Sequence, residues 1–231
     1  GYLAKATTYS YDVSLHSLKV GITGDYTVSS SEKLYGNMYM QEKLLYAYEQ
    51  KAKGTKTLIF NNGINTSKQV FHLFREQGYE IRHLDNTHNE QERREILDWF
   101  KNKPDAVLSS VSILTTGFDE PSVETIIINR ATKSLTLYHQ MIGRGSRIFK
   151  EKKEFTVIDL GNNANGVGEL VSCRQHRVDR PPRQFAVSDF AAACATKPAH
   201  FTHREGREVV VKEEALTADA TGVSVDLLGF V

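Results

Sequence analysis

The 231-residue sequence has little of what marks several protein classes. Its 2 Cys cannot form a disulfide scaffold, and its 5 Pro exclude a collagen-like chain. No apolar run approaches the roughly 18 residues of a membrane span, and no signal core follows Gly1, so we expect a cytoplasmic protein without a membrane partner. A net charge of +1 argues against a strongly basic nucleic-acid wrap, but a local phosphate-binding surface stays open.

The composition changes near residue 170. All 12 Ile, 11 Asn and 10 Tyr precede that point, whereas both Cys follow it. A second domain, a disordered tail, a fusion and a shifted reading frame would each produce such a change. We therefore divide the chain into a linker (1–30), a main domain (31–170) and a tail of uncertain structure (171–231), and we predict no metal site.

Short apolar runs alternate with helical patterns in the main domain, which predicts a doubly wound α/β layer. The expected strands are 57–60, 81–84, 106–109, 123–128 and 155–159. The expected helices are 31–53, one capped by Thr66 and Ser67 that runs through Gln77, 90–101 capped by Asn89, and 134–147. Residues 1–30 add one or two strands.

Polar loops follow four of these strands, at 61–66, 85–89, 110–121 and 130–132. In a parallel sheet, ligands bind beyond the carboxyl ends of the strands, so this edge is a candidate binding site. Loops are polar in most proteins, and that reading stays open.

Two segments carry a specific resemblance. Ser112-Ile-Leu-Thr-Thr-Gly-Phe-Asp-Glu-Pro121 is followed by Gln140-Met-Ile-Gly-Arg-Gly-Ser-Arg147. This pair resembles motifs V and VI of superfamily 2 helicases of the DEAD/DEAH and type III restriction branch, and Phe60-Asn61-Asn62 resembles motif IV. The resemblance spans about 55–160 and implies a second RecA-like domain, a three-layer α/β/α fold with a mostly parallel sheet.

The resemblance implies that Arg144 and Arg147 are arginine fingers for ATP and that Gln140 positions the nucleotide or the attacking water. Arginine suits this role because its planar fork stays charged. Standing three residues apart, the two arginines would point the same way on a helix. A solvated basic helix end is the alternative.

Gly117, Asp119 and Gly143 are the predicted nucleotide contacts. A glycine permits a tight turn or a close backbone approach, and a carboxylate at Asp119 would accept a hydrogen bond from a ribose hydroxyl. The alternative for Asp119 is a carboxylate that organises the turn before Pro121.

Contacts to a DNA or RNA backbone are predicted at two places. Hydroxyls can bind phosphates without reading sequence, which points to residues of the motif V segment: Ser110, Ser112, Thr115 and Thr116. Asn62, Gly63 and Thr66 form the second place, because a helix N-terminus favours anions. An ordinary capped helix start explains those three equally well.

Two motifs of a complete motor are absent from the sequence: a Gly-x-x-x-x-Gly-Lys-Ser/Thr loop and an Asp-Glu-x-Asp/His box. We therefore expect ATP and Mg²⁺ to be held mainly by a first RecA-like domain of the same polypeptide, and the chain alone to lack ATPase activity. The alternative is a stand-alone nucleic-acid-binding or adaptor module. The coding sequence upstream of Gly1 would separate the two.

Overall fold

The computed structural model describes residues 3–111, 119–166 and 174–178. These residues belong to one compact unit that extends from Gly1 to Pro182. Their centre is a seven-stranded sheet in the order β3-β4-β2-β5-β6-β1-β7, with every pair of neighbours parallel. The strands are β1 (Lys5–Tyr11), β2 (Thr57–Asn61), β3 (Ile81–Leu84), β4 (Val107–Val111), β5 (Thr125–Asn129), β6 (Glu154–Asp159) and β7 (Arg174–Val178).

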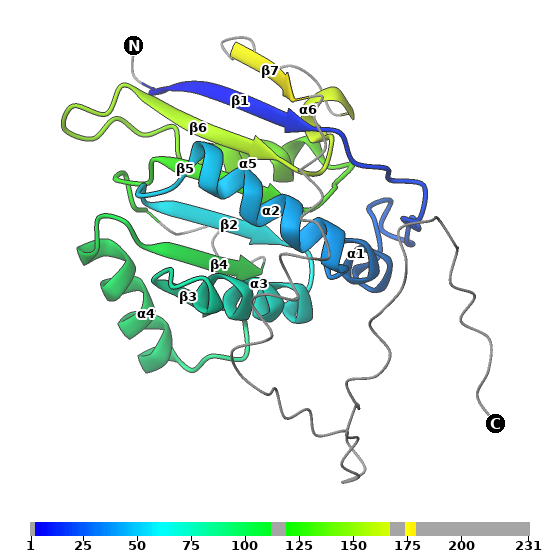
Figure 1. Ribbon diagram of the computed structural model, residues 1–231, viewed down its shortest axis with the longest axis horizontal. Helices are drawn as coiled ribbons and strands as arrows, with labels where there is room; N and C mark the ends of the chain where they lie inside the picture. Colours follow the sequence, from blue (N-terminus) through cyan, green and yellow to red (C-terminus); the bar gives the residue numbers. More distant parts are fainter. Residues whose placement is uncertain (1–2, 112–118, 167–173, 179–231) are drawn as a thin grey trace, which may run out of the picture. The chain divides into compact units, whose positions relative to one another are not determined.

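Helices cover both faces of the sheet (Figure 1). Both faces need a cover because both are apolar, and a separate core lies on each face. In β5, Ile126 and Ile128 point into the first core and Ile127 points into the second. The first core lies under α4 (Glu90–Asn102) and α5 (Leu135–Gly143). The second lies under α1 (Val28–Tyr35), α2 (Met38–Lys51) and α3 (Ile64–Glu76). A short helix, α6 (Asn163–Gly166), follows β6. The predicted RecA-like three-layer α/β/α fold is confirmed.

Several local sequence signals correctly predicted where strands and helices begin or end. Each of the five predicted strands is present within two residues of its expected bounds. Asn89 caps α4 in a complete capping box with Glu92. Gly78 follows α3 with φ +81°, the left-handed conformation that glycine adopts most readily.

Two helix predictions on the other face of the sheet, which α1, α2 and α3 cover, were wrong. The helix expected at 31–53 is two helices, because Asn37 caps α2 with its side chain and separates it from α1. Thr66 and Ser67 do not cap α3, since that helix begins at Ile64 after Gly63, and both side chains are buried in its first turn.

The sheet also extends beyond the predicted main domain at both ends of the chain. β1 comes from residues 1–30, and it pairs with β6 on one side and β7 on the other. β7 lies after residue 170, where the composition changes. The change in composition therefore does not coincide with the end of the sheet.

Candidate functional site

The predicted finger arginines lie at the edge of the sheet where the strands begin. α5 runs back from the end of β5 and stops at Gly143, so Arg144 is its C-cap and Arg147 lies in the following turn. The helix predicted through Arg147 was therefore wrong. The turn is tied to the start of β1 by a 2.6 Å hydrogen bond from Ala4 N to Ser146 O. We call this side of the sheet the amino edge.

Gly145 explains why the helix stops where it does. A Cβ atom at this position would lie 2.4 Å from Cδ2 of Phe155 and 3.1 Å from Cγ1 of Ile126. Only glycine lets the turn approach the starts of β5 and β6 so closely. Gly143 is different, because a Cβ atom there would meet nothing within 4 Å. The close approach expected for Gly143 is thus made by Gly145 within this chain.

Arg147 and Asp119 form an ion pair between the two helicase-like motifs. Their side chains are 45% and 59% exposed, so both remain accessible to a partner. Burial lowers the pKa of Arg144, Arg147 lowers it further, and Asp119 opposes the change. Gln140 is exposed one helical turn before Arg144. The structure therefore brings Arg144, Arg147 and Asp119 together on one accessible surface.

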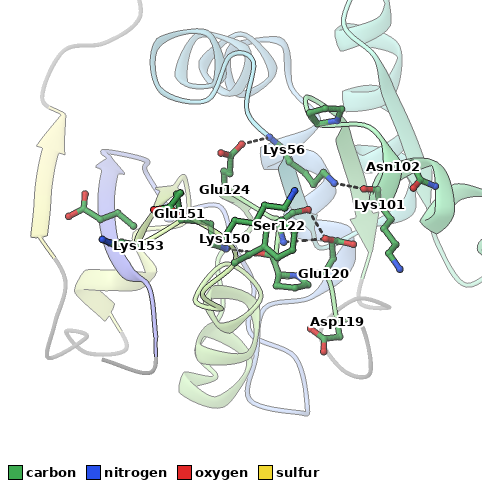
Figure 2. Close-up of a pocket in the computed structure, with 15 residues that line it drawn as sticks. Lys56, Lys101, Asn102, Asp119, Glu120, Ser122, Glu124, Lys150, Glu151 and Lys153 are labelled. Carbon is green, nitrogen blue, oxygen red and sulfur yellow. Dashed lines mark hydrogen bonds between the residues drawn. The ribbon is translucent and has the colours of Figure 1, made fainter.

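An open cavity of about 1060 Å³ adjoins Asp119 on the amino edge. Its lining alternates in charge, with Lys56, Lys101 and Lys150 near Glu120 and Glu124 (Figure 2). Lys56 Nζ donates to the backbone oxygen of Lys101 at 2.8 Å, and burial lowers the pKa of Lys56. The positive and negative side chains offset each other, so the cavity alone does not indicate a ligand.

The opposite side of the sheet, which we call the carboxyl edge, contains a chain of buried hydrogen bonds. Asn129 Nδ2 donates to Asn61 at 2.8 Å, and Asn61 Nδ2 donates to Ser109 Oγ at 3.0 Å. Ser109 Oγ is 2.7 Å from Ser67 Oγ, which is 2.8 Å from His83 Nδ1. These bonds connect β5, β2, β4, α3 and β3.

The chain of hydrogen bonds ends on Asp85, which has no exposed surface. Burial would raise its pKa, but hydrogen bonds from Thr87 and His83 hold that pKa well below its ordinary value. Burial lowers the pKa of His83, although Asp85 opposes this, so the ring is neutral at pH 7. Because the carboxylate only accepts, His83 Nε2 donates to it at 2.9 Å, and Nδ1 accepts from Ser67.

A carboxylate of this chain occupies the N-terminus of α3, where a phosphate was predicted to bind. Glu32 Oε1 accepts from Asn65 N at 3.0 Å, and Oε2 accepts from Asn65 Nδ2 at 3.1 Å. A Cβ atom at Gly63 would lie 2.1 Å from Glu32 Oε1, so Gly63 is required for this contact. The helix end favours an anion, as predicted, and Glu32 supplies one.

Three other predicted nucleic-acid contacts have partners within the chain or are buried. Asn62 donates to Ser31 Oγ at 2.7 Å, and Ser110 Oγ donates to the Ile59 oxygen at 3.2 Å. Thr66 is 1% exposed. The remaining predicted contacts lie outside the described residues: Ser112, Thr115, Thr116 and Gly117.

A second carboxylate from the N-terminal part of the chain binds between β5 and α5. Asp25 accepts from Thr132 Oγ1 at 2.6 Å and from Lys133 N at 2.9 Å, and Arg130 Nη2 lies 3.8 Å away. Burial would raise the pKa of Asp25, but these hydrogen bonds lower it overall. Sequence reasoning missed both Asp25 and Glu32, because their partners are far away in the sequence and neither belongs to a motif.

Within residues 3–111, 119–166 and 174–178, no group of three or more His, Cys, Asp or Glu side chains is placed to hold a metal ion. Among the helices that the structure describes, none is both long and apolar enough to cross a membrane.

Comparison with known proteins identifies the fold. A Saccharomyces cerevisiae protein named as the ATP-dependent helicase IRC3 is 30% identical over 168 residues, which are 71% of this chain and 24% of that protein. The chain thus spans about a quarter of the length of that relative. A fragment described as an HsdR subunit of a type I restriction enzyme from Vibrio vulnificus YJ016 superposes with a TM-score of 0.59 at 17% identity, covering 77% of this chain and 37% of the fragment.

Domain 2 of the DEAD-box helicase Mss116p, solved bound to an RNA duplex, superposes with a TM-score of 0.53 at 14% identity. The match covers 82% of this chain and 69% of that structure. Residues 39–149 match the helicase conserved C-terminal domain family, and this match includes both motifs that carried the resemblance. Residues 39–149 are thus similar to the helicase conserved C-terminal domain family, and the chain has a RecA-like α/β fold.

Proposed function

We propose that this chain is the second motor domain of an ATP-dependent helicase or translocase. In this proposal its amino edge faces ATP and Mg²⁺ held by a first RecA-like domain, and its carboxyl edge forms part of a nucleic-acid groove. The observation that carries the proposal is the accessible group of Arg144, Arg147 and Asp119 at the amino edge. The ion pair between Arg147 and Asp119 joins the two segments that resemble motifs V and VI, which supports the proposal.

Each residue of this group has a task in the proposed reaction. Arg147 and Arg144 would stabilise the charge that develops on the γ-phosphate, and Gln140 would orient the attacking water. Asp119 would accept a hydrogen bond from a ribose hydroxyl, as would fit its exposed carboxylate. Gly117 and Gly143 would allow the nucleotide or the other domain to approach the backbone. Until ATP is bound, Asp119 serves as the counterion of Arg147.

The proposed cycle depends on exchange of that ion pair. When the two domains close, Arg147 would leave Asp119 for the phosphates while Asp119 turns to the ribose. Hydrolysis would remove the γ-phosphate, and the Arg147–Asp119 pair would form again as the cleft opens. Domain closure of this kind usually takes microseconds to milliseconds.

Nucleic acid would bind at the carboxyl edge through the phosphate backbone. The candidate contacts are Asn62 and Gly63 at the start of α3, with Ser112, Thr115 and Thr116 of motif V. Thr66 and Ser110 are buried, so in this proposal they support the surface without contacting phosphates. The carboxylate of Glu32 at the start of α3 supports the idea that an anion is favourable there. Domain 2 of Mss116p, which has the same fold, was solved bound to an RNA duplex, and this likeness supports nucleic-acid binding.

The deciding experiment is Arg147→Ala in the protein that carries both RecA-like domains. Loss of an arginine finger lowers turnover by on the order of 10³-fold while leaving ATP binding largely intact. Steady-state hydrolysis and binding of a fluorescent ATP analogue measure the two effects separately. Lys153→Ala is the matched control, because it removes an exposed cation nearby on the same edge.

Unchanged turnover by Arg147→Ala would exclude the finger role. If the natural protein has no Walker A loop before Gly1 and this chain binds single-stranded nucleic acid, the adaptor module becomes the better explanation.

A further inference from the structure

The motor role leaves one structural question at the amino edge. Arg147 lies beyond the end of α5, and Asp119 lies in the segment that leads into β5, so neither belongs to a helix or strand. A finger must nevertheless be held close to its working position, because catalysis depends steeply on geometry. Something else must fix the distance between these two segments.

Lys152 makes that connection. Its Nζ donates to the backbone oxygens of Pro121 at 2.6 Å, Val123 at 2.8 Å and Gly145 at 3.0 Å. An ammonium group has three N–H donors, so all three are used on this chain. Hydrogen bonds from a charged donor are stronger than neutral ones.

Two of the Lys152 contacts lie within two residues of the Arg147–Asp119 ion pair. Pro121 is two residues after Asp119, and Gly145 is two residues before Arg147. The two segments are thus joined twice, once by the Lys152 ammonium through their backbones and once by the Arg147–Asp119 pair through side chains. Together, the Lys152 contacts and the Arg147–Asp119 pair link these two short segments into a closed ring.

Lys152 is itself held in place. Its backbone N donates to the Phe149 oxygen at 2.9 Å, and the neighbouring Lys153 oxygen accepts from Lys5 N at 2.8 Å, at the start of β1. β6 begins at the next residue, Glu154. The ammonium group therefore projects from a fixed point of the sheet.

We propose that Lys152 is a positioning residue that sets the spacing of Arg147 and Asp119 and so orients the arginine finger. Lys152 does not contact the phosphates, since its three donors are committed to carbonyls. Burial lowers the pKa of Lys152 to about 8, with Glu124 and Glu120 opposing the change, as fits an ammonium enclosed by protein. This inference rests on the proposed motor function.

The test compares Lys152→Met with Lys153→Met in the protein that carries both RecA-like domains. Methionine keeps an unbranched side chain one atom shorter than that of lysine and removes the donors. We expect kcat for ATP hydrolysis to fall by about 10²-fold in Lys152→Met, as for a misplaced catalytic group, while KM changes little. Lys153→Met, which removes the exposed neighbour, should leave both constants unchanged.

A double variant separates positioning from general damage. If Lys152 acts through Arg147, then Lys152→Met combined with Arg147→Ala should be no slower than Arg147→Ala alone. Losses that multiply would overturn the inference. Full turnover by Arg147→Ala would instead exclude the finger role, and absence of ATP hydrolysis by the unaltered two-domain protein would refute the motor function, so these failures are distinguishable.

A second measurement uses this chain alone. The heteronuclear NOE of the Arg147 Nε–Hε group should drop in Lys152→Met and stay unchanged in Lys153→Met. An equally ordered Arg147 in Lys152→Met would overturn the inference. If Lys152→Met does not fold, Lys152→Gln, which keeps two N–H donors, replaces it and should show a smaller loss of order.

Discussion

The two edges of the sheet use polar residues in different ways. At the carboxyl edge, Asn129, Asn61 and Asp85 are buried and hydrogen-bonded to one another or to neighbours within the chain. At the amino edge, Arg147 and Asp119 are about half exposed, and each has the other as its ion-pair partner. The buried polar residues of the carboxyl edge stabilise the fold, whereas the exposed charges of the amino edge remain available to another molecule.

This difference changes how the polar loops should be interpreted. Polar loops follow the strands at the carboxyl edge, and position in the sheet favours this edge as a ligand site. Its anion-binding positions at α3 and near Thr132 are nevertheless occupied by Glu32 and Asp25. The amino edge differs, because its exposed ion pair can exchange partners without unfolding anything.

The largest expected effect on the fold comes from Asp85→Ala. The change removes a carboxylate that has no exposed surface and leaves His83, whose side chain is 9% exposed, without its acceptor, which should cost about 3 kcal/mol of unfolding free energy. Urea denaturation measures it. Asp105→Ala removes a carboxylate that is 53% exposed and should cost less than about 0.5 kcal/mol. Equal losses would contradict the contrast between buried and exposed polar groups.

Gly145→Ala tests the packing of the amino edge. The new methyl group would overlap the ring of Phe155, so we expect about 2 kcal/mol of destabilisation. Gly143→Ala is the matched control, because it meets open space at the end of α5 and should be neutral or stabilising by up to about 1 kcal/mol. Thermal melts of the two variants suffice, and a neutral Gly145→Ala would mean that the turn can move away from Phe155.

Mild acid should act on the carboxyl edge through His83. Its pKa in the folded protein is below the value of 6.5 that applies on unfolding, so the unfolded state binds the proton first. Stability should therefore decrease as the pH falls below 6.5. His83→Gln removes the titrating ring, and its denaturation midpoint should vary less over this range. An identical pH profile would assign the acid sensitivity to other groups.

Glu32→Gln should have the smallest effect on stability, about 0.5 kcal/mol, because a partly exposed charge at a helix N-terminus contributes little. Its informative effect is on binding. Fluorescence anisotropy with a labelled single strand should show affinity rising a few-fold, since α3 then lacks its own anion. Glu76→Gln removes the same charge at the other end of α3 and should leave affinity unchanged. If both variants bind equally, the phosphate site is not at α3.

Local sequence signals predicted most of the fold. Apolar β-branched runs located β2 to β6, and Asn89 with Glu92 located the start of α4, because each signal lies within a few neighbouring residues. The end of α5 was misjudged since Ile142, Gly143 and Arg144 permit a helix. What stops the helix is the contact of Gly145 with Phe155, a residue of another strand.

The candidate site also contains residues that local sequence patterns could identify and residues that they could not. Motif order and spacing identified Arg144, Arg147 and Asp119, and the structure brings them together. Glu32 and Lys152 could not be identified, since their roles come from contacts to residues distant in sequence or to backbone oxygens, which leave no residue pattern. A helix N-terminus predicts that an anion is favourable, but it does not tell whether the chain supplies that anion itself.

The place of β1 in the sheet has a consequence for protein synthesis. β1 is made early, yet Lys5 pairs in register with Glu154, roughly 150 residues later. At a ribosomal rate of about 5–20 residues per second, its hydrogen-bonding groups wait on the order of 10–30 s for β6. β2, β3, β4 and β5 can meet during that interval. The strand of this sheet that is made first is thus among the last of them to be paired, and until then it is open to a chaperone or to misassociation with another nascent chain.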